Sequence, residues 1–202
     1  MGISATICEA VPVTDSVGGL VPEFDRKKPD AQPAHGCYPG CTSLDKDIMR
    51  SYRIQGIPDA LASAARQSMR SPQYGHPAHA ELATGYGPCR LCLQTFQVDT
   101  DERLLFTYQP FTDPTALPAP GPVFIHRAGC ERYDGAELPD ALRPLPLVIE
   151  GYGGGGALLA QRRVGSALFE EVLETVLAED DVAYAHLRNA EAGCFIARVD
   201  RG

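Results

Sequence analysis

The sequence predicts an α+β fold of short, mostly antiparallel strands and about three helices, preceded by an irregular N-terminal tail. Apolar segments of strand length recur along the chain, two further segments have helical periodicity, and the two kinds of segment do not alternate regularly. The chain has 202 residues, of which 20 are glycine and 17 are proline. We therefore expect many loops around one core of ordinary size.

The first 50 residues differ from the rest of the chain. They contain several glycines and no hydrophobic periodicity, and five prolines interrupt them: Pro12, Pro22, Pro29, Pro33 and Pro39. A segment of this composition buries too little apolar surface to offset the loss of chain entropy. We expect residues 1–50 to be an irregular or disordered tail and residues 51–202 to form a single α+β domain.

The predicted strands are bounded by glycine, proline and polar turn residues. They are residues 51–55, 103–108, 123–126, 145–152, 182–188 and 194–199. Apolar residues at intervals of three and four predict helices at 58–70 and 166–179. Prolines between 110 and 122 predict an extended loop. The run Gly153–Gly156 predicts a hairpin turn or a mobile loop, because it lacks the Lys and Ser/Thr of a phosphate-binding loop.

Charge and hydropathy exclude several partners. The formal net charge is −8, and the basic pairs Lys27–Lys28 and Arg162–Arg163 are too short for the patch that neutralises nucleic-acid phosphates. We therefore expect no nucleic-acid partner. No stretch approaches the roughly 18–20 apolar residues of a membrane span. The start of the chain lacks the basic segment of a secretory signal, so we expect a cytoplasmic protein with no membrane span.

The chain has seven cysteines: Cys8, Cys37, Cys41, Cys89, Cys92, Cys130 and Cys194. An odd number without a secretory signal is not typical of a disulfide framework. In a reducing compartment, such residues serve as metal ligands or as buried thiols.

The densest group of candidate ligands begins with Cys89 and Cys92. A tight turn at this Cys-x2-Cys spacing directs both sulfurs to the same side. His126 and Cys130 follow, and they share one face if residues 126–132 begin a third helix. Together the two pairs predict a closed Cys3His tetrahedron around a structural zinc ion. The order of knuckle, hairpin strands and a pair at a helix start is similar to treble-clef zinc folds.

A second group consists of His186, Arg188 and Cys194, which are the candidate catalytic residues. His186 and Arg188 lie two apart on a predicted strand and so face the same side. A thiolate close to an imidazole can act as a nucleophile with its base. For the cysteines, three interpretations stay open: a structural zinc site, buried reduced thiols beside core histidines, and a catalytic or redox cysteine.

Four blocks of the sequence together resemble a known family. They are GPCRLCL (87–93), LLFTYQPF (104–111), GPVFIHRAGCERY (121–133) and HLRNAEAGCF (186–195). Their order resembles the bacterial family known as domain of unknown function 1203, over about residues 52–201. The family has no assigned activity, so the resemblance implies a domain and not a reaction. Because the blocks are rich in Cys, His, Arg and Tyr, it also suggests a pocket lined by His126, His186, Arg188 and the Cys89/Cys92 knuckle.

The sequence leaves open whether the protein is an enzyme. The first hypothesis is a zinc-stabilised binding or interaction module with no turnover, whose partner the sequence does not identify. The second is a small enzyme with a Cys/His pocket that acts on an anionic small molecule held by Arg188 or Arg90.

Overall fold

The computed structural model describes residues 52–85, 87–113 and 115–202, and the predicted tail at 1–50 lies outside this part of the chain. Within it, strands are more numerous than helices. In chain order the elements are β1 (Tyr52–Gln55), α1 (Asp59–Ser68), β2 (His79–Leu82), β3 (Glu102–Tyr108), β4 (Gly121–His126), β5 (Asp134–Gly135), η1 (Asp140–Leu142), β6 (Leu147–Tyr152), β7 (Leu158–Val164), η2 (Ser166–Leu168), α2 (Phe169–Leu177), β8 (Tyr184–Asn189) and β9 (Phe195–Arg201).

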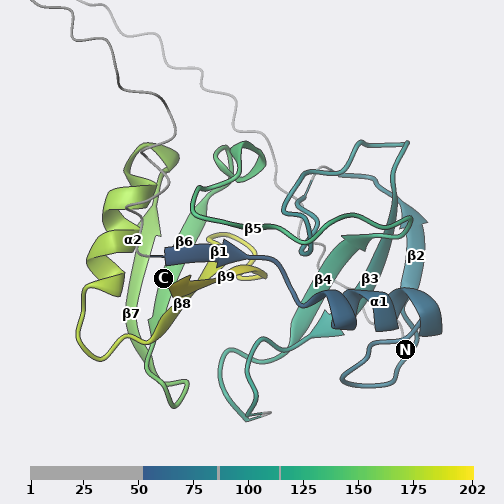
Figure 1. Ribbon diagram of the computed structural model, residues 1–202. Helices are drawn as coiled ribbons and strands as arrows, with labels where there is room; N and C mark the ends of the chain where they lie inside the picture. Colours follow the sequence, from purple (N-terminus) through teal and green to yellow (C-terminus); the bar gives the residue numbers. More distant parts are fainter. Residues whose placement is uncertain (1–51, 86, 114) are drawn as a thin grey trace, which may run out of the picture. The chain divides into compact units, whose positions relative to one another are not determined.

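The strands form two antiparallel sheets (Figure 1). The larger sheet has six strands in the order β5-β1-β9-β8-β6-β7, and the smaller one has three in the order β2-β3-β4. In the larger sheet β6 lies between β7 and β8, with Glu150 opposite His186. In the smaller sheet Arg103 of β3 lies opposite His126 of β4. These two registers position the polar groups described below.

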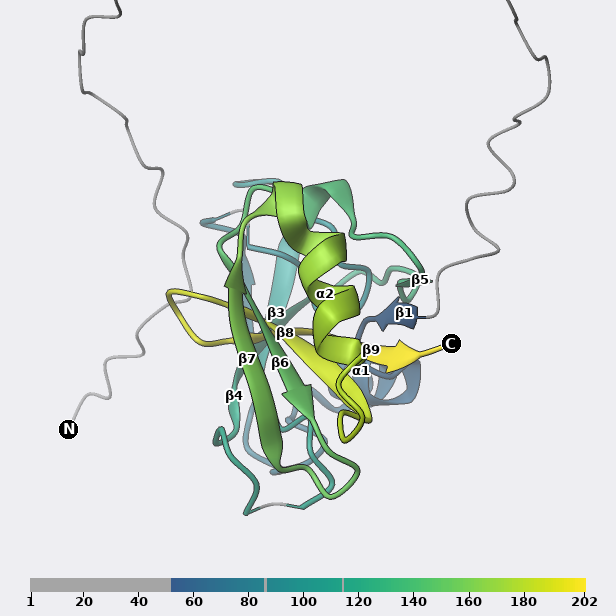
Figure 2. The ribbon, with the colours of Figure 1, turned by 90° about the vertical axis from the view of Figure 1, so that its left-hand side faces the viewer.

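The helix α2 packs against the six-stranded sheet. It contacts β6, β7 and β8, and Figure 2 shows it beside these strands. Its buried residues follow the helical repeat and are Phe169, Leu173, Val176 and Leu177. Glu170 and Glu171 lie in its first turn, where negative charge is favourable to the helix dipole. Together, α2 and the sheet bury the larger of the two hydrophobic clusters.

The helix α1 belongs to the second hydrophobic cluster, with the strands β3 and β4. Ala62 and Ala65 are its fully buried residues, so the helix contributes a narrow stripe of small side chains. It ends at Met69, which adopts a left-handed conformation (φ 52°) and donates its backbone N–H to the carbonyl of Ala65. Cys89, Cys92 and Cys130 pack in this same cluster.

The prediction of mostly antiparallel strands is confirmed, whereas the number of helices is wrong. The described residues contain two α-helices and two short 3-10 helices, not three helices. The third helix, expected at 126–132, is absent there: His126 ends β4, and the residues after it form a loop. Gly129 in this loop has φ +107°, which is incompatible with an α-helix. Residues Gly153–Gly156 form the predicted hairpin turn, between β6 and β7.

In the described residues, no helix is both long enough and apolar enough to cross a membrane.

Candidate metal centre and a second polar cluster

A tight turn presents the first pair of candidate ligands. The backbone N–H of Leu93 donates to the carbonyl of Cys89 (2.9 Å), and the N–H of Cys89 donates to the carbonyl of Gln94 (2.8 Å). Leu93 has φ +59° and a fully buried side chain. This left-handed residue costs free energy, which burial of its side chain offsets. The turn brings the sulfurs of Cys89 and Cys92 to one side, as predicted.

The second pair comes from the end of β4 and the loop that follows. The ladder continues one residue past the strand, since the N–H of Arg127 donates to the carbonyl of Glu102 (2.9 Å). The chain then turns at Gly129, which brings Cys130 back toward His126. The two residues therefore meet without the helix that the sequence suggested, and the predicted similarity to treble-clef folds lacks its helical part.

All four predicted ligands come together. One ligand atom from each of Cys89, Cys92, His126 and Cys130 lies within 4.8 Å of all the others. The sulfurs of Cys89 and Cys130 are 3.7 Å apart, and the sulfur of Cys92 is 3.5 Å from Nδ1 of His126. The sulfur separation is too long for a disulfide, whose S–S bond is about 2.0 Å, and the three cysteines are free thiols.

Side chains around this cluster orient the ligands. Oδ2 of Asp101 lies 3.4 Å from Nε2 of His126, and it also accepts the backbone N–H of Gln97 (2.7 Å). An Asp101 carboxylate at Nε2 favours the tautomer with its proton there, which leaves the Nδ1 lone pair facing the sulfurs. The ring of Phe96 packs on the imidazole at 4.5 Å between ring centres.

Positive charge and donors face the sulfurs. Arg66 of α1 donates from Nη2 to the sulfur of Cys130 (3.6 Å) and from Nε to the carbonyl of His126 (2.9 Å). The backbone N–H of His126 lies 3.4 Å from the sulfur of Cys89. Arg90 is 3% exposed; burial lowers the pKa of its guanidinium to about 10, while the charge of Cys89 raises it. Both arginines therefore favour thiolate.

The ligand side chains of the cluster differ in their pKa values. Hydrogen bonds from Cys130 and then Cys92 hold the pKa of the Cys89 thiol far below its ordinary value, against the effect of burial. Hydrogen bonds to Cys130 and Cys89 raise the pKa of Cys92, and burial adds to this. Hydrogen bonds to Cys130 and Cys89 also raise the pKa of His126 to about 10. A cation bound among these atoms would take the place of the shared protons.

The second predicted group lies in the six-stranded sheet and centres on an ion pair. Arg188 donates from Nε to Oε2 of Glu150 (2.6 Å), and both side chains are 7% exposed. The hydroxyl of Tyr152 donates to the same oxygen (2.5 Å), and Gln161 donates to Oε1 (3.0 Å). Burial and the hydrogen bond to Glu150 raise the pKa of the Tyr152 hydroxyl. Sequence reasoning did not find Glu150, because it reads as an ordinary polar residue within an apolar strand.

His186 is fully buried beside this pair. Four aromatic rings surround its imidazole, with ring centres 4.9–5.2 Å away: Phe111, Tyr152, Tyr184 and Phe195. Neither ring nitrogen has a hydrogen-bond partner within the described residues. Burial, then the charges of Arg188 and Arg198, lower the pKa of His186 to about 3, so the ring is neutral at pH 7.

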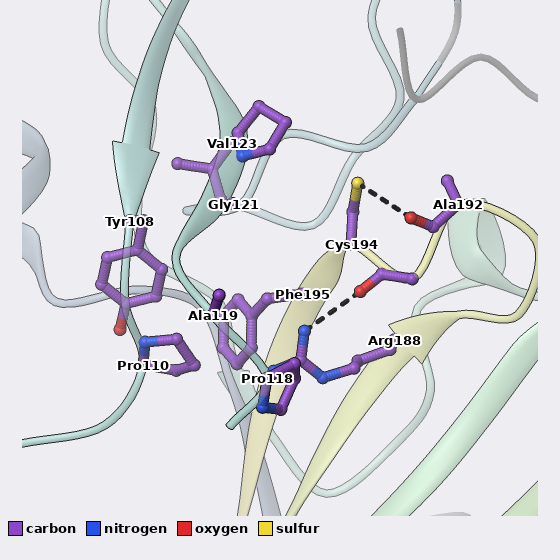
Figure 3. A pocket seen from close by; sticks show the side chains of 12 residues that line it. Tyr108, Pro110, Pro118, Ala119, Gly121, Val123, Arg188, Ala192, Cys194 and Phe195 are labelled. Atoms are coloured by element: carbon purple, nitrogen blue, oxygen red, sulfur yellow. Dashed lines mark hydrogen bonds between the residues drawn. The ribbon is translucent and has the colours of Figure 1, made fainter. Parts of the chain in front are cut away.

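Arg188 and Cys194 line one cavity of about 200 Å³, together with Phe195 (Figure 3). His126, His186 and the Cys89/Cys92 knuckle do not line it, so this cavity is not the single pocket suggested from the sequence. The residues suggested for that pocket lie in different places. His126 and the knuckle belong to the Cys3His cluster, Arg188 lines the cavity, and His186 is buried among aromatic rings. Roles for His186, Arg188 and Cys194 in catalysis stay predictions.

Comparison with known proteins identifies the family. One family, described as a protein of unknown function (DUF1203), matches residues 86–201, which is more than half of the chain. This segment contains both clusters, whereas Arg66 and the rest of α1 precede it. No curated protein and no solved structure matches the chain. The resemblance seen in the sequence is thus confirmed, and the chain belongs to the DUF1203 family.

Proposed function

We propose that the protein binds one zinc ion through Cys89, Cys92, Nδ1 of His126 and Cys130, and that it is a zinc-stabilised binding domain. The metal is structural in this proposal. Four protein ligands close a tetrahedral zinc site, whereas catalytic sites keep one position for water or substrate.

The observation that carries the proposal is the match between two distances and a zinc tetrahedron. Zn–S bonds are about 2.3 Å and Zn–N bonds about 2.0–2.1 Å. The edges of such a tetrahedron are about 3.8 Å between two sulfurs and about 3.6 Å between sulfur and nitrogen. The corresponding distances are 3.7 Å between Cys89 and Cys130 and 3.5 Å between Cys92 and His126.

Ligand chemistry also supports zinc. Three thiolates and an imidazole are ligands that zinc prefers over magnesium or calcium, which favour oxygen. Zinc with three thiolates and a neutral imidazole carries a net charge of about −1. Arg66 beside Cys130 and the buried Arg90 beside Cys89 offset this charge. The carboxylate of Asp101 supplies the outer partner that metal-binding histidines usually have.

The site's position explains a structural role. Its ligands come from the turn after Pro88, the end of β4 and the following loop, and Arg66 connects it to α1. One bound ion would therefore hold together two segments that are distant in the sequence, residues 89–92 and 126–130, beside α1. The hydrophobic cluster around α1 has fewer buried residues than the cluster around α2 and the larger sheet. The binding free energy of a metal would compensate for this smaller core.

The test is the metal content of full-length protein purified under reduction and without chelators. We expect about one zinc per chain by elemental analysis. The variant His126→Asn should lose most of the metal on dialysis. His79→Asn is the matched control, since His79 is an exposed histidine outside the cluster. Reduced wild-type protein without metal, or His126→Asn that retains zinc like the control, would contradict the proposal.

A second candidate function, a small enzyme that acts on an anion, concerns the other cluster. One observation favours it: Arg188, whose guanidinium group can hold an anion, lines a cavity. Binding of an anion there is the first requirement of this proposal, and it can be tested independently of zinc.

A further inference from the structure

The cavity beside Arg188 lies where the two sheets meet. Residues of β3, β4, β8 and β9 line it, with the loop after β3 and the hairpin between β8 and β9 (Figure 3). Its walls are mainly apolar. They include Pro110, Pro118, Pro122, Val123 and Phe195. Its volume of about 200 Å³ suits a small molecule and not a polymer.

One polar group in this wall has unused hydrogen-bonding capacity. Arg188 donates from Nε to Glu150 and from Nη1 to the carbonyl of Gly193 (3.0 Å). Its Nη2 atom is buried and has no partner within the described residues, although Arg188 as a whole is 6% exposed. In Figure 3 the guanidinium group points toward Pro118 and Phe195. An unpaired guanidinium nitrogen at this depth is costly, and an acceptor in the cavity would remove that cost.

The surroundings favour an acceptor with negative charge. Glu150 is already engaged by Arg188, Tyr152 and Gln161, so it has little capacity for a donor from a ligand. Tyr108, another wall residue, feels the positive charges of Arg198 and Arg132, which oppose the effect of burial on its pKa. His186 is neutral at pH 7 and adds no charge.

We propose that this cavity binds a small monocarboxylate, whose carboxylate accepts a hydrogen bond from Nη2 of Arg188 while its apolar body packs on the proline and phenylalanine walls. A single charge fits because one guanidinium group, partly neutralised by Glu150, faces the ligand. A phosphate dianion would leave charge without a partner among apolar walls. This inference does not depend on the zinc proposal.

The test is titration of isotope-labelled full-length protein, with its metal content as purified, by amide chemical shifts. The probes are acetate, isobutyrate and benzoate, each compared with its neutral amide and with inorganic phosphate. We expect at least one carboxylate to shift the amides of residues 188–195. We expect it to bind about tenfold or more tightly than its amide, as a charge-assisted hydrogen bond implies.

Two variants locate the site. Arg188→Lys keeps a positive charge for Glu150 and removes Nη2, and should weaken binding about tenfold. Gly121→Leu should block the cavity: Gly121 lines it, and a Cβ there meets no atom within 4 Å, so the fold should persist. Gly165→Leu is the matched control, because Gly165 has the same free space outside this cavity.

Three results would overturn the proposal. The first is that none of the three carboxylates binds. The second is that amides or phosphate bind as tightly as the carboxylates. The third is that Gly121→Leu, correctly folded, binds like Gly165→Leu. Loss of zinc with intact carboxylate binding, or the reverse, would separate this inference from the proposed function.

Discussion

The Cys3His cluster and the Glu150–Arg188 pair are both polar groups inside the protein, but the chain holds them differently. The cysteines lie on a turn and a loop, outside the ladders of the two sheets. Glu150 and Arg188 lie on neighbouring strands β6 and β8, and a continuous ladder fixes their spacing. The first cluster therefore needs its own ligand to hold it in place, whereas the second is held by the sheet.

This difference implies that the two clusters stabilise the protein independently of each other. A metal contributes its binding free energy to the segments that carry its ligands. A buried ion pair contributes little net stability when intact, and it is costly when one partner is lost. The predictions below test this contrast, in order of decreasing effect at pH 7.

Removal of zinc should have the largest effect, and it should be local. Structural zinc contributes about 10–16 kcal/mol of binding free energy in small zinc domains. On chelation we expect hydrogen exchange to rise strongly in residues 87–96 and 121–133, and to change little in β6 and β8. Mass spectrometry of exchanged peptides measures this. Equal hydrogen exchange with and without chelator would mean that the cluster keeps its structure without a metal ion.

Breaking the ion pair should come next. Arg188→Leu leaves Glu150 buried without its cation, so we expect a loss of about 3–5 kcal/mol in the free energy of unfolding. The double variant Glu150→Gln/Arg188→Leu should recover part of the loss, because no charge is left unpaired. Urea unfolding measures both, and zinc content should stay at the wild-type value. The coupling would be refuted if the double variant lost as much free energy of unfolding as Arg188→Leu and Glu150→Gln lose together.

Replacing the outer partner of the histidine should weaken zinc binding without abolishing it. Asp101→Asn removes the charge next to Nε2 of His126, and such changes cost about 10–100-fold in metal affinity. Competition with a fluorescent chelator measures the affinity. Glu102→Gln is the matched control, since Glu102 is adjacent in sequence and forms an exposed pair with Arg127. Equal affinities for the two variants would show that Asp101 does not support the site.

The effect that is smallest at pH 7 concerns His186, because it develops only as the pH decreases. Because its folded pKa is lowered to about 3, the unfolded state binds the extra proton below about pH 6.5. Stability should thus fall as the pH decreases from about 6.5 to about 3, by up to about 1.4 kcal/mol per pH unit from this group. His186→Phe should show a shallower loss over this window. Parallel curves for wild type and variant, from unfolding at several pH values, would argue against a neutral buried imidazole.

Much of the fold follows from the sequence because most strands carry an apolar face. The strands near 103–108, 145–152 and 182–188 are rich in buried residues and were predicted within a few positions. The edge strands β2 and β7 were missed. In β7 only Ala160 and Val164 are buried, so the segment lacks the alternation that marks a strand.

At the candidate site, residues close together in the sequence could be predicted, whereas contacts between distant residues could not. The spacing of Cys89 with Cys92, and of His126 with Cys130, was enough to predict the four ligands. The reason given for the second pair was wrong, since Gly129 and a loop replace the expected helix. Asp101 could not be found, because it approaches His126 through the pairing of β3 with β4, and sequence alone does not fix that register.

X-ray absorption at the zinc edge of the full-length, reduced protein would show the ligands of the metal. We expect one zinc bound by three sulfurs at about 2.3 Å and one nitrogen at about 2.0–2.1 Å, with no bound water. Protein without zinc, or zinc bound mainly by oxygen and nitrogen, would contradict a structural Cys3His centre.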